Sequence, residues 1–168
     1  MPMRSTLILN RLIVAALFGL ASLPAAQAAT PAAVSLKDPA VFVQQLREMG
    51  YAPEPIEGSS SPTFVINSAA GKLVITMGGC TANRDCSYVV LLSSFHDVKR
   101  PPADWVAARN AEFDLIKVWV NDEGLLTYSA GFFAEGMDRG LFRSWIDSTE
   151  ASGTDLAQQA IKAGIVKP

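Results

Sequence analysis

The two cysteines are the residues with the clearest potential for chemistry. Cys80 and Cys86 are the only cysteines of the chain and have five residues between them, in the stretch GGCTANRDCSYVV. A structural zinc site would need four ligands, and only His96 could join the two thiolates. Redox-active cysteine pairs typically have C-x-x-C spacing at the start of a helix, and this stretch has neither that spacing nor a helix start. We therefore predict a disulfide here, with no metal and no cofactor.

The sequence offers no catalytic group to accompany the single histidine. His96 precedes Asp97, and a His-Asp pair can begin a catalytic relay, but a nucleophile must then stand against the ring. No G-x-S-x-G motif supplies one, and phosphate-binding and dinucleotide motifs are also absent. Several carboxylates fall at turns and element ends, where acids cap helices or shape loops: Asp104, Asp114, Asp122, Glu123 and Asp138. We predict no catalytic residue and no enzyme.

The first 28 residues have the pattern of a secretory signal peptide. Arg4 and Arg11 are followed by an apolar run over residues 12–20, which is shorter than a membrane span, and then by Ala-Gln-Ala at 26–28. Cleavage there leaves a mature chain that begins at Ala29 and matures where a close cysteine pair is usually oxidised. We predict a periplasmic or secreted protein, with a signal peptide over 1–28, a flexible leader over 29–37 and one domain over 38–163.

The charge of the mature chain excludes one class of partner. Cleavage removes two arginines and leaves 12 basic against 16 acidic residues, a net charge near −4. Nucleic-acid binding needs clustered lysine and arginine to replace counterions, and the longest basic run is Lys99-Arg100. We expect no nucleic-acid partner, and no membrane association after cleavage.

The first half of the mature chain predicts a helix followed by three strands. Asp38 is a good N-cap before Pro39, and apolar residues recur at helical spacing up to Gly50. Strands are indicated by β-branched and apolar runs at 63–69, 72–77 and 87–95. The cysteines stand at the base of the loop between the last two, and such short links join antiparallel neighbours.

The second half adds a short helix, a hairpin and further helix. The pattern predicts a helix over 104–112, strands over 113–120 and 125–133 around the turn NDEG, and two helical pieces, 138–152 and 154–164, separated by Gly153. The order is α-β-β-β-α-β-β-α. This order predicts the α+β class, with an antiparallel sheet of about five strands and helices on one face.

Several of these motifs resemble the YbjN-like family, whose members are described as proposed sensory transduction regulators. The carriers are LREMGY, the cysteine stretch GGCTANRDCSYVVLLSSF, DWVAARNAEFDLIKVWVNDEGLLTY and GLFRSWI, and the match spans residues 38–161. The resemblance implies a fold like that of type III secretion chaperones. It supplies no catalytic residues.

The sequence departs from the family pattern in two places. Exported relatives often carry Trp-Asn at the end of the short helix, where this chain has Arg109-Asn110. They also tend to have a Gly-Asp-Pro-like turn in the first hairpin, where this chain has Ala69-Ala70-Gly71. These differences leave the fold expectation in place and weaken the transfer of any specific surface.

Two hypotheses about function follow. The first is a non-enzymatic protein-interaction module, chaperone-like or regulatory, that pairs with itself or with another envelope protein; an exposed aromatic strip on the sheet would consist of Tyr88, Trp119 and Tyr128. The alternative is a small-ligand-binding domain with a pocket between sheet and helices, lined by Phe133, Phe142 and Trp145. The sequence names neither the partner nor the ligand.

Overall fold

A computed structural model describes residues 33–68 and 71–167 of the chain. The predicted signal peptide and the first four residues of the predicted leader lie outside the described residues, as do Ala69 and Ala70 of the predicted turn. The elements follow in the order α1 (Pro39–Glu48), β1 (Glu54–Pro55), β2 (Thr63–Ser68), β3 (Gly71–Gly78), β4 (Tyr88–Phe95), α2 (Ala103–Glu112), β5 (Lys117–Val120), β6 (Leu126–Phe133) and α3 (Arg139–Lys162).

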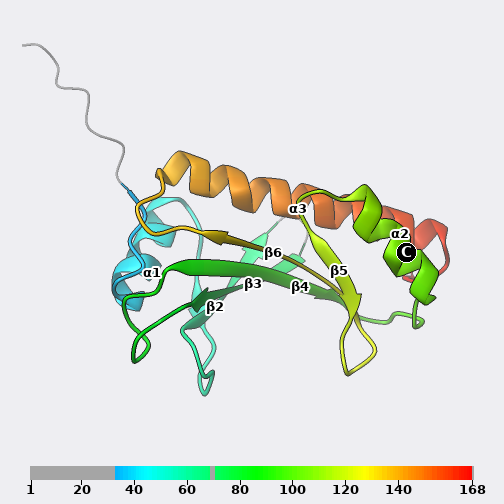
Figure 1. Ribbon diagram of the computed structural model, residues 1–168, viewed down its shortest axis with the longest axis horizontal. Coiled ribbons are helices and arrows are strands. Elements are labelled where there is room, and N and C mark those ends of the chain that lie inside the picture. Colours follow the sequence, from blue (N-terminus) through cyan, green and yellow to red (C-terminus); the bar gives the residue numbers. More distant parts are fainter. Residues whose placement is uncertain (1–32, 69–70, 168) are drawn as a thin grey trace, which may run out of the picture.

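The strands form one antiparallel sheet in the order β1-β2-β3-β4-β6-β5. Helix α3 runs along one face of this sheet, with α1 near one end and α2 near the other (Figure 1). The predicted α+β class is thereby confirmed. A sixth strand, β1, joins the five that the sequence predicts, because Glu54 and Pro55 of the predicted loop pair with Val65 and Phe64.

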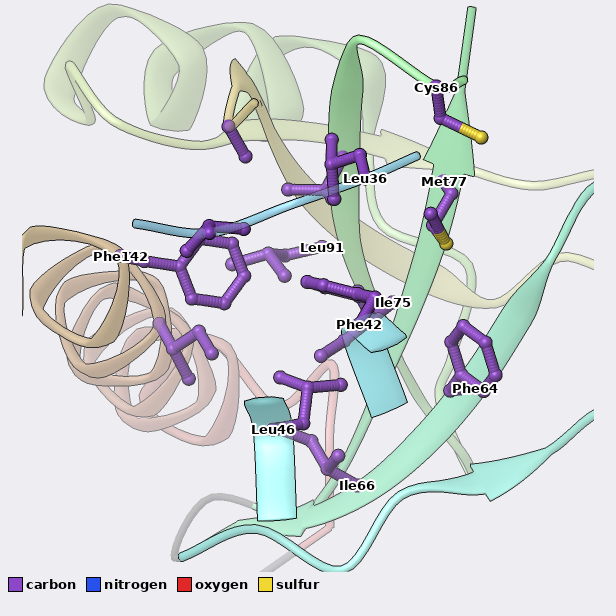
Figure 2. Packing of buried hydrophobic residues seen from close by; sticks show 14 of the residues in the cluster. Leu36, Phe42, Leu46, Phe64, Ile66, Ile75, Met77, Cys86, Leu91 and Phe142 are labelled. Carbon is purple, nitrogen blue, oxygen red and sulfur yellow. The ribbon is translucent and has the colours of Figure 1, made fainter. Parts of the chain in front are cut away.

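The first half of the core lies between α1, α3 and strands β2 to β4. Asp38 caps α1 as predicted, since its carboxylate accepts a hydrogen bond from the amide of Ala40 at 2.8 Å. Helical spacing places Phe42 and Leu46 on one side of α1, and both are fully buried (Figure 2). The ring of Phe42 packs edge-on against Phe142 of α3, with centroids 5.8 Å apart. This contact ties the two helices together over the sheet.

The second half of the core lies beneath the C-terminal half of α3. Tyr128 of β6 is buried there together with Leu156 and Ala160 of α3, and Trp105 of α2 packs against them. Because α3 contributes to both halves of the core, it must extend over most of the sheet.

The predicted break in the last helix at Gly153 is wrong. The sequence indicated two helical pieces separated by this glycine, but Arg139–Lys162 is one helix of 24 residues. Gly153 is buried, and a Cβ atom at this position would lie 2.2 Å from the hydroxyl oxygen of Tyr128. The glycine therefore allows α3 to approach β6 closely and does not interrupt the helix.

Residues 33–37, predicted as the end of a flexible leader, are instead packed against the domain. Val34 and Leu36 are 1% and 0% exposed. The amide of Val34 donates to the carbonyl of Met137 at 2.7 Å, and the carbonyl of Leu36 accepts from the amide of Cys86 at 3.0 Å. The buried side chains of Val34 and Leu36 and the backbone hydrogen bonds of the same two residues hold this segment in place. We call residues 33–37 the N-terminal strap.

Two further boundaries differ from the predictions. Strand β5 begins at Lys117 rather than at residue 113, because α2 continues to Glu112 and the chain then turns while Phe113 and Ile116 pack into the second half of the core. The domain also extends beyond residue 163: Val166 forms a β-bridge with Val98.

Candidate interaction surface

The described residues leave one face of the sheet, the face opposite the helices, without a covering helix. On β3, Leu73 and Ile75 are buried under the helices, so the alternating Val74 and Thr76 lie on the other face. Within residues 33–68 and 71–167, no helix packs on that other face (Figure 1). We call it the open face. Strand register assigns to it Thr63, Val65, Val74, Thr76, Tyr88, Val90, Leu92, Ser129 and Phe133.

An exposed aromatic pair lies at one end of the open face. Tyr88 of β4 and Phe133 of β6 are Cα partners, and their rings meet edge to face with centroids 6.2 Å apart. Phe133 is 78% exposed and Tyr88 is 38% exposed. A Cβ atom on Gly78 would lie 2.2 Å from the ring of Tyr88. Glycine at this position thus lets the tyrosine ring lie across the neighbouring strand.

A shallow groove of about 280 Å³ lies at the other end of the open face. Apolar side chains of Val65, Val74 and Leu92 line it, and so does His96. His96 is exposed. The groove is a concave extension of the apolar surface that leads to the aromatic pair.

Two of the three residues of the predicted aromatic strip lie on the open face. Tyr88 is one, and Trp119 is the other, because its Cα partner Thr127 is on the face opposite the buried Tyr128. Trp119 is half-buried and also lines a hollow with Arg100 and Ala103 at the start of α2. Tyr128 is 2% exposed, so its assignment to the surface was wrong. It points toward the helices because it alternates with Thr127 and shares its face with Leu126, which is also buried.

The predicted ligand pocket does not form from the three residues assigned to it. Phe142 is buried between α3 and the sheet, whereas Phe133 is on the open face, so the sheet separates them. Trp145 is half-buried and stacks on Phe132, with centroids 4.6 Å apart. The alternation of β6 was the signal that places Phe132 inside and Phe133 outside.

Both edges of the sheet are protected against further strand pairing. At the β5 edge, the side-chain amide of Asn110 donates to the carbonyl of Val118 at 2.7 Å, and its oxygen accepts from the Val118 amide at 2.8 Å. Asn110 thus takes the place of a neighbouring strand. At the opposite edge, β1 is only two residues long and one of them is Pro55. A proline and a very short strand both discourage pairing with another chain.

Asn110→Leu is expected to destabilise the protein by roughly 1–2 kcal/mol, because it leaves both polar groups of Val118 without their partner. The freed edge should also promote association, which light scattering would detect. Urea unfolding measures the first effect. Ala111→Leu, which adds the same side chain to an exposed position of the same helix, is the matched control. Equal stability of both variants would contradict this role of Asn110.

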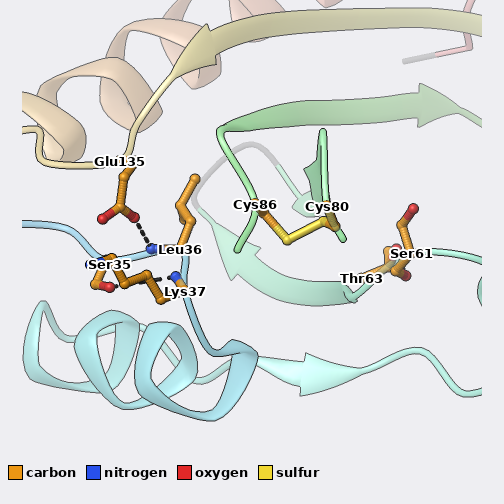
Figure 3. The surroundings of a disulfide bond; sticks show 8 residues. All are labelled: Ser35, Leu36, Lys37, Ser61, Thr63, Cys80, Cys86 and Glu135. Atoms are coloured by element: carbon orange, nitrogen blue, oxygen red, sulfur yellow. Dashed lines mark hydrogen bonds between the residues drawn. A yellow bond between two sulfur atoms is a disulfide. The ribbon is translucent and has the colours of Figure 1, made fainter. Parts of the chain in front are cut away.

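The predicted disulfide is present and holds the loop that anchors the N-terminal strap. Cys80 and Cys86 are bonded, and Leu36 lies between this loop and Glu135 (Figure 3). The loop amide of Asp85 donates to the strap carbonyl of Lys37 at 3.0 Å. Within the ring, Ala82, Asn83 and Asp85 all have positive φ. Asparagine and aspartate tolerate this conformation, but it is unfavourable for Ala82, so the ring holds at least this residue in a backbone conformation that it would otherwise leave.

Polar groups meet beneath the middle of α3, between the two halves of the core. Burial and, to a smaller extent, the charge of Asp147 together raise the pKa of Tyr51 to about 12. Burial also raises the pKa of Glu150, partly offset by a hydrogen bond with Ser68. The pKa of Tyr128 is raised for the same reason, burial. These groups are best buried uncharged.

Glu150→Gln is expected to raise the free energy of unfolding at pH 7 and to leave it nearly unchanged at pH 3. The raised pKa means that the folded protein holds the proton more tightly than the unfolded chain. Ionisation therefore disfavours folding, and the penalty grows as the pH rises above the unfolded value of about 4.3. Asp147→Asn removes a charge that raises this pKa and should reduce the benefit of the substitution. An equal effect at both pH values would contradict the account.

The described part of the chain contains neither a metal-binding cluster nor a membrane-spanning helix. There, no three histidine, cysteine, aspartate or glutamate side chains come together to hold a metal ion. No helix among residues 33–68 and 71–167 is both long enough and apolar enough to span a membrane.

Comparison with known proteins identifies the fold and no more. The sequence matches no known family model and no curated protein sequence. The structure is similar to the crystal structure of YbjN from E. coli, a proposed transcription regulator, with a TM-score of 0.61. The similarity covers 81% of this chain and 99% of YbjN, at 11% sequence identity. The fold is therefore YbjN-like, in agreement with the resemblance found in the sequence.

Proposed function

We propose that this protein is an exported, non-enzymatic interaction module that binds another protein chain through the open face of its sheet. The observation that carries the proposal is the exposed pair of Tyr88 and Phe133, which continues an apolar surface with no covering element among the described residues. Contiguous apolar surface with aromatic side chains is typical of protein-binding sites.

The arrangement of the sheet supports binding by its face. Asn110 occupies the β5 edge, and the short β1 with Pro55 forms the opposite edge, so addition of a partner strand is disfavoured at both. The similarity to YbjN, a proposed regulator, agrees with a regulatory or interaction role. The signal-like first 28 residues and the disulfide support export.

A photo-crosslinking amino acid at Phe133 tests the proposal in cells that make the full-length protein. The substitution replaces an exposed aromatic ring by a larger one, so the fold should be preserved. Crosslinks to a protein are expected at Phe133 and not at Gln158, an exposed position on α3 that serves as the matched control. No crosslink at Phe133, or equal crosslinking at both positions, would overturn the proposal. Mass spectrometry of the same product checks that the mature chain begins at Ala29.

A further inference from the structure

One row of side chains crosses the whole open face and has opposite charges at its ends. Consecutive Cα partners connect all six strands along this row. Partners in antiparallel strands point to the same face, so the row lies entirely on the open face. From β1 to β5 it reads Glu54, Val65, Val74, Leu92, Ser129 and Lys117. The two charged ends are exposed and the centre is apolar.

This row is complementary to a second copy of itself. Consider a two-fold axis that lies in the interface, parallel to the strands, above the space between β3 and β4. Rotation about it brings a second sheet face to face with the first and reverses the order of the strands. Lys117 of the second copy then faces Glu54 of the first, and Glu54 of the second copy faces Lys117. A row with the same charge at both ends would instead repel its copy.

From this complementarity we infer that the open face binds a second copy of this chain, as a symmetric dimer with its two sheets packed face to face. The inference rests on the proposed function and adds the identity of the partner. Along the same axis, Tyr88 of each copy lies next to the space between β3 and β4, so the two aromatic pairs meet in one cluster. Their burial removes the most exposed aromatic side chain, Phe133, from water.

The dimensions of the sheet fit a dimer of modest affinity. Six strands span roughly 24 Å at about 4.8 Å per strand, and strands of eight residues are about 26 Å long. The face therefore offers roughly 600 Å² per copy, somewhat below the 800 Å² or so of a standard interface. The usual crossing angle of about 30° between packed sheets shifts the ends of the row by roughly 6 Å, which Lys117 and Glu54 side chains can span.

Sedimentation equilibrium of the mature protein over a concentration series tests the inference. The wild-type protein is expected to be in monomer–dimer equilibrium. Lys117→Glu should raise the dissociation constant about tenfold or more, because it places like charges together at two symmetric positions. Glu54→Lys should do the same, and the double variant Glu54→Lys/Lys117→Glu should return to within a few-fold of wild type. Lys162→Glu, an equal charge change at the end of α3, is the control and should have no effect.

A second variant tests the apolar centre. Leu92→Glu places a charge in the middle of the row and should abolish the dimer, while circular dichroism confirms that the monomer is folded. A wild-type protein that remains monomeric at every concentration would overturn the inference, and so would a dimer that none of these changes weakens. If the dimer is absent but position 133 crosslinks to a different protein, the proposed function still stands and only the inferred dimer is wrong. If position 133 forms no crosslink at all, the proposed function and the inferred dimer are both wrong.

Discussion

Gly153→Ala is expected to lower the free energy of unfolding by about 2 kcal/mol, although alanine is the better helix former by roughly 1 kcal/mol. The added Cβ atom would lie 2.2 Å from the hydroxyl oxygen of Tyr128. The tyrosine cannot move aside easily, because it is buried and its ring packs against Phe95 with centroids 5.7 Å apart. Either the ring or α3 must shift, and overpacking of this kind is unfavourable in a close-packed core.

Denaturant unfolding of Gly153→Ala, Thr154→Ala, Tyr128→Leu and the double variant Tyr128→Leu/Gly153→Ala tests this contact. Thr154→Ala, at an exposed position next along the helix, is the matched control and should be neutral or stabilising. Tyr128→Leu alone should destabilise by removing a buried ring, but it should make Gly153→Ala much less harmful. Strict additivity of the two changes would show that they do not interact. Stabilisation by Gly153→Ala in the wild-type background would contradict the close approach of α3 to β6.

Replacing both cysteines by alanine is expected to destabilise the protein by roughly 2 kcal/mol. The disulfide restricts the unfolded chain, so its removal increases the conformational entropy that folding must overcome. A second effect should be local. The amides of Asp85 and Cys86 hold the N-terminal strap through the carbonyls of Lys37 and Leu36. Without the disulfide, the ring can leave its positive φ angles, and these hydrogen bonds should open more often.

Amide hydrogen exchange separates the two effects. The wild-type protein is first brought to the overall stability of the variant by adding denaturant. At that matched stability, the amides at positions 85 and 86 should exchange faster in the variant than in the wild type. The amides of the central strand β3 should exchange at the same rate in both proteins. Ala82→Gly in the oxidised protein is a useful comparison, because it relieves a positive φ of 48° without breaking the ring. Unchanged unfolding energy together with unchanged loop exchange would show that the disulfide does not support the strap.

Local patterns were sufficient to predict much of the fold. The helix cap at Asp38, the apolar spacing on α1 and the short hairpins predict elements that the structure contains. The spacing and surroundings of Cys80 and Cys86 predict their bond. These features depend on residues close together in the sequence, which is why they can be read from it.

Three of the differences from the sequence predictions depend on contacts between distant segments. The sequence predicts a break in the helix at Gly153, because only the position of Tyr128 across the core shows that this glycine allows close packing. The N-terminal strap has only two alternating apolar residues, Val34 and Leu36, which is too short a pattern to predict an ordered segment. Its order depends on hydrogen bonds to Met137 and Cys86, which are distant in the sequence. Asn110 gave no local sign that it would cover the edge of β5.

The assignment of aromatic residues to the two faces was within reach of the sequence. In LTYSAGFF, Leu126, Tyr128, Ala130 and Phe132 share one face, while Thr127, Ser129, Gly131 and Phe133 share the other. The first set is the more apolar and is the one that faces the helices. Applied strictly, the two-residue period would have placed Tyr128 inside and Phe133 outside. The open face thus follows from the alternation of strands, once the helices are known to cover one side only.

In the cell, we expect the open face to be covered by another protein chain. Hydroxyl-radical footprinting measures this directly, by comparing oxidation of Phe133 in intact cells with oxidation in the purified protein diluted to a monomer. Leu141, 52% exposed at the start of α3, is the internal reference. We expect Phe133 to be strongly protected in cells while Leu141 is oxidised to the same extent in both samples. Equal oxidation of Phe133 in the two samples would contradict the claim.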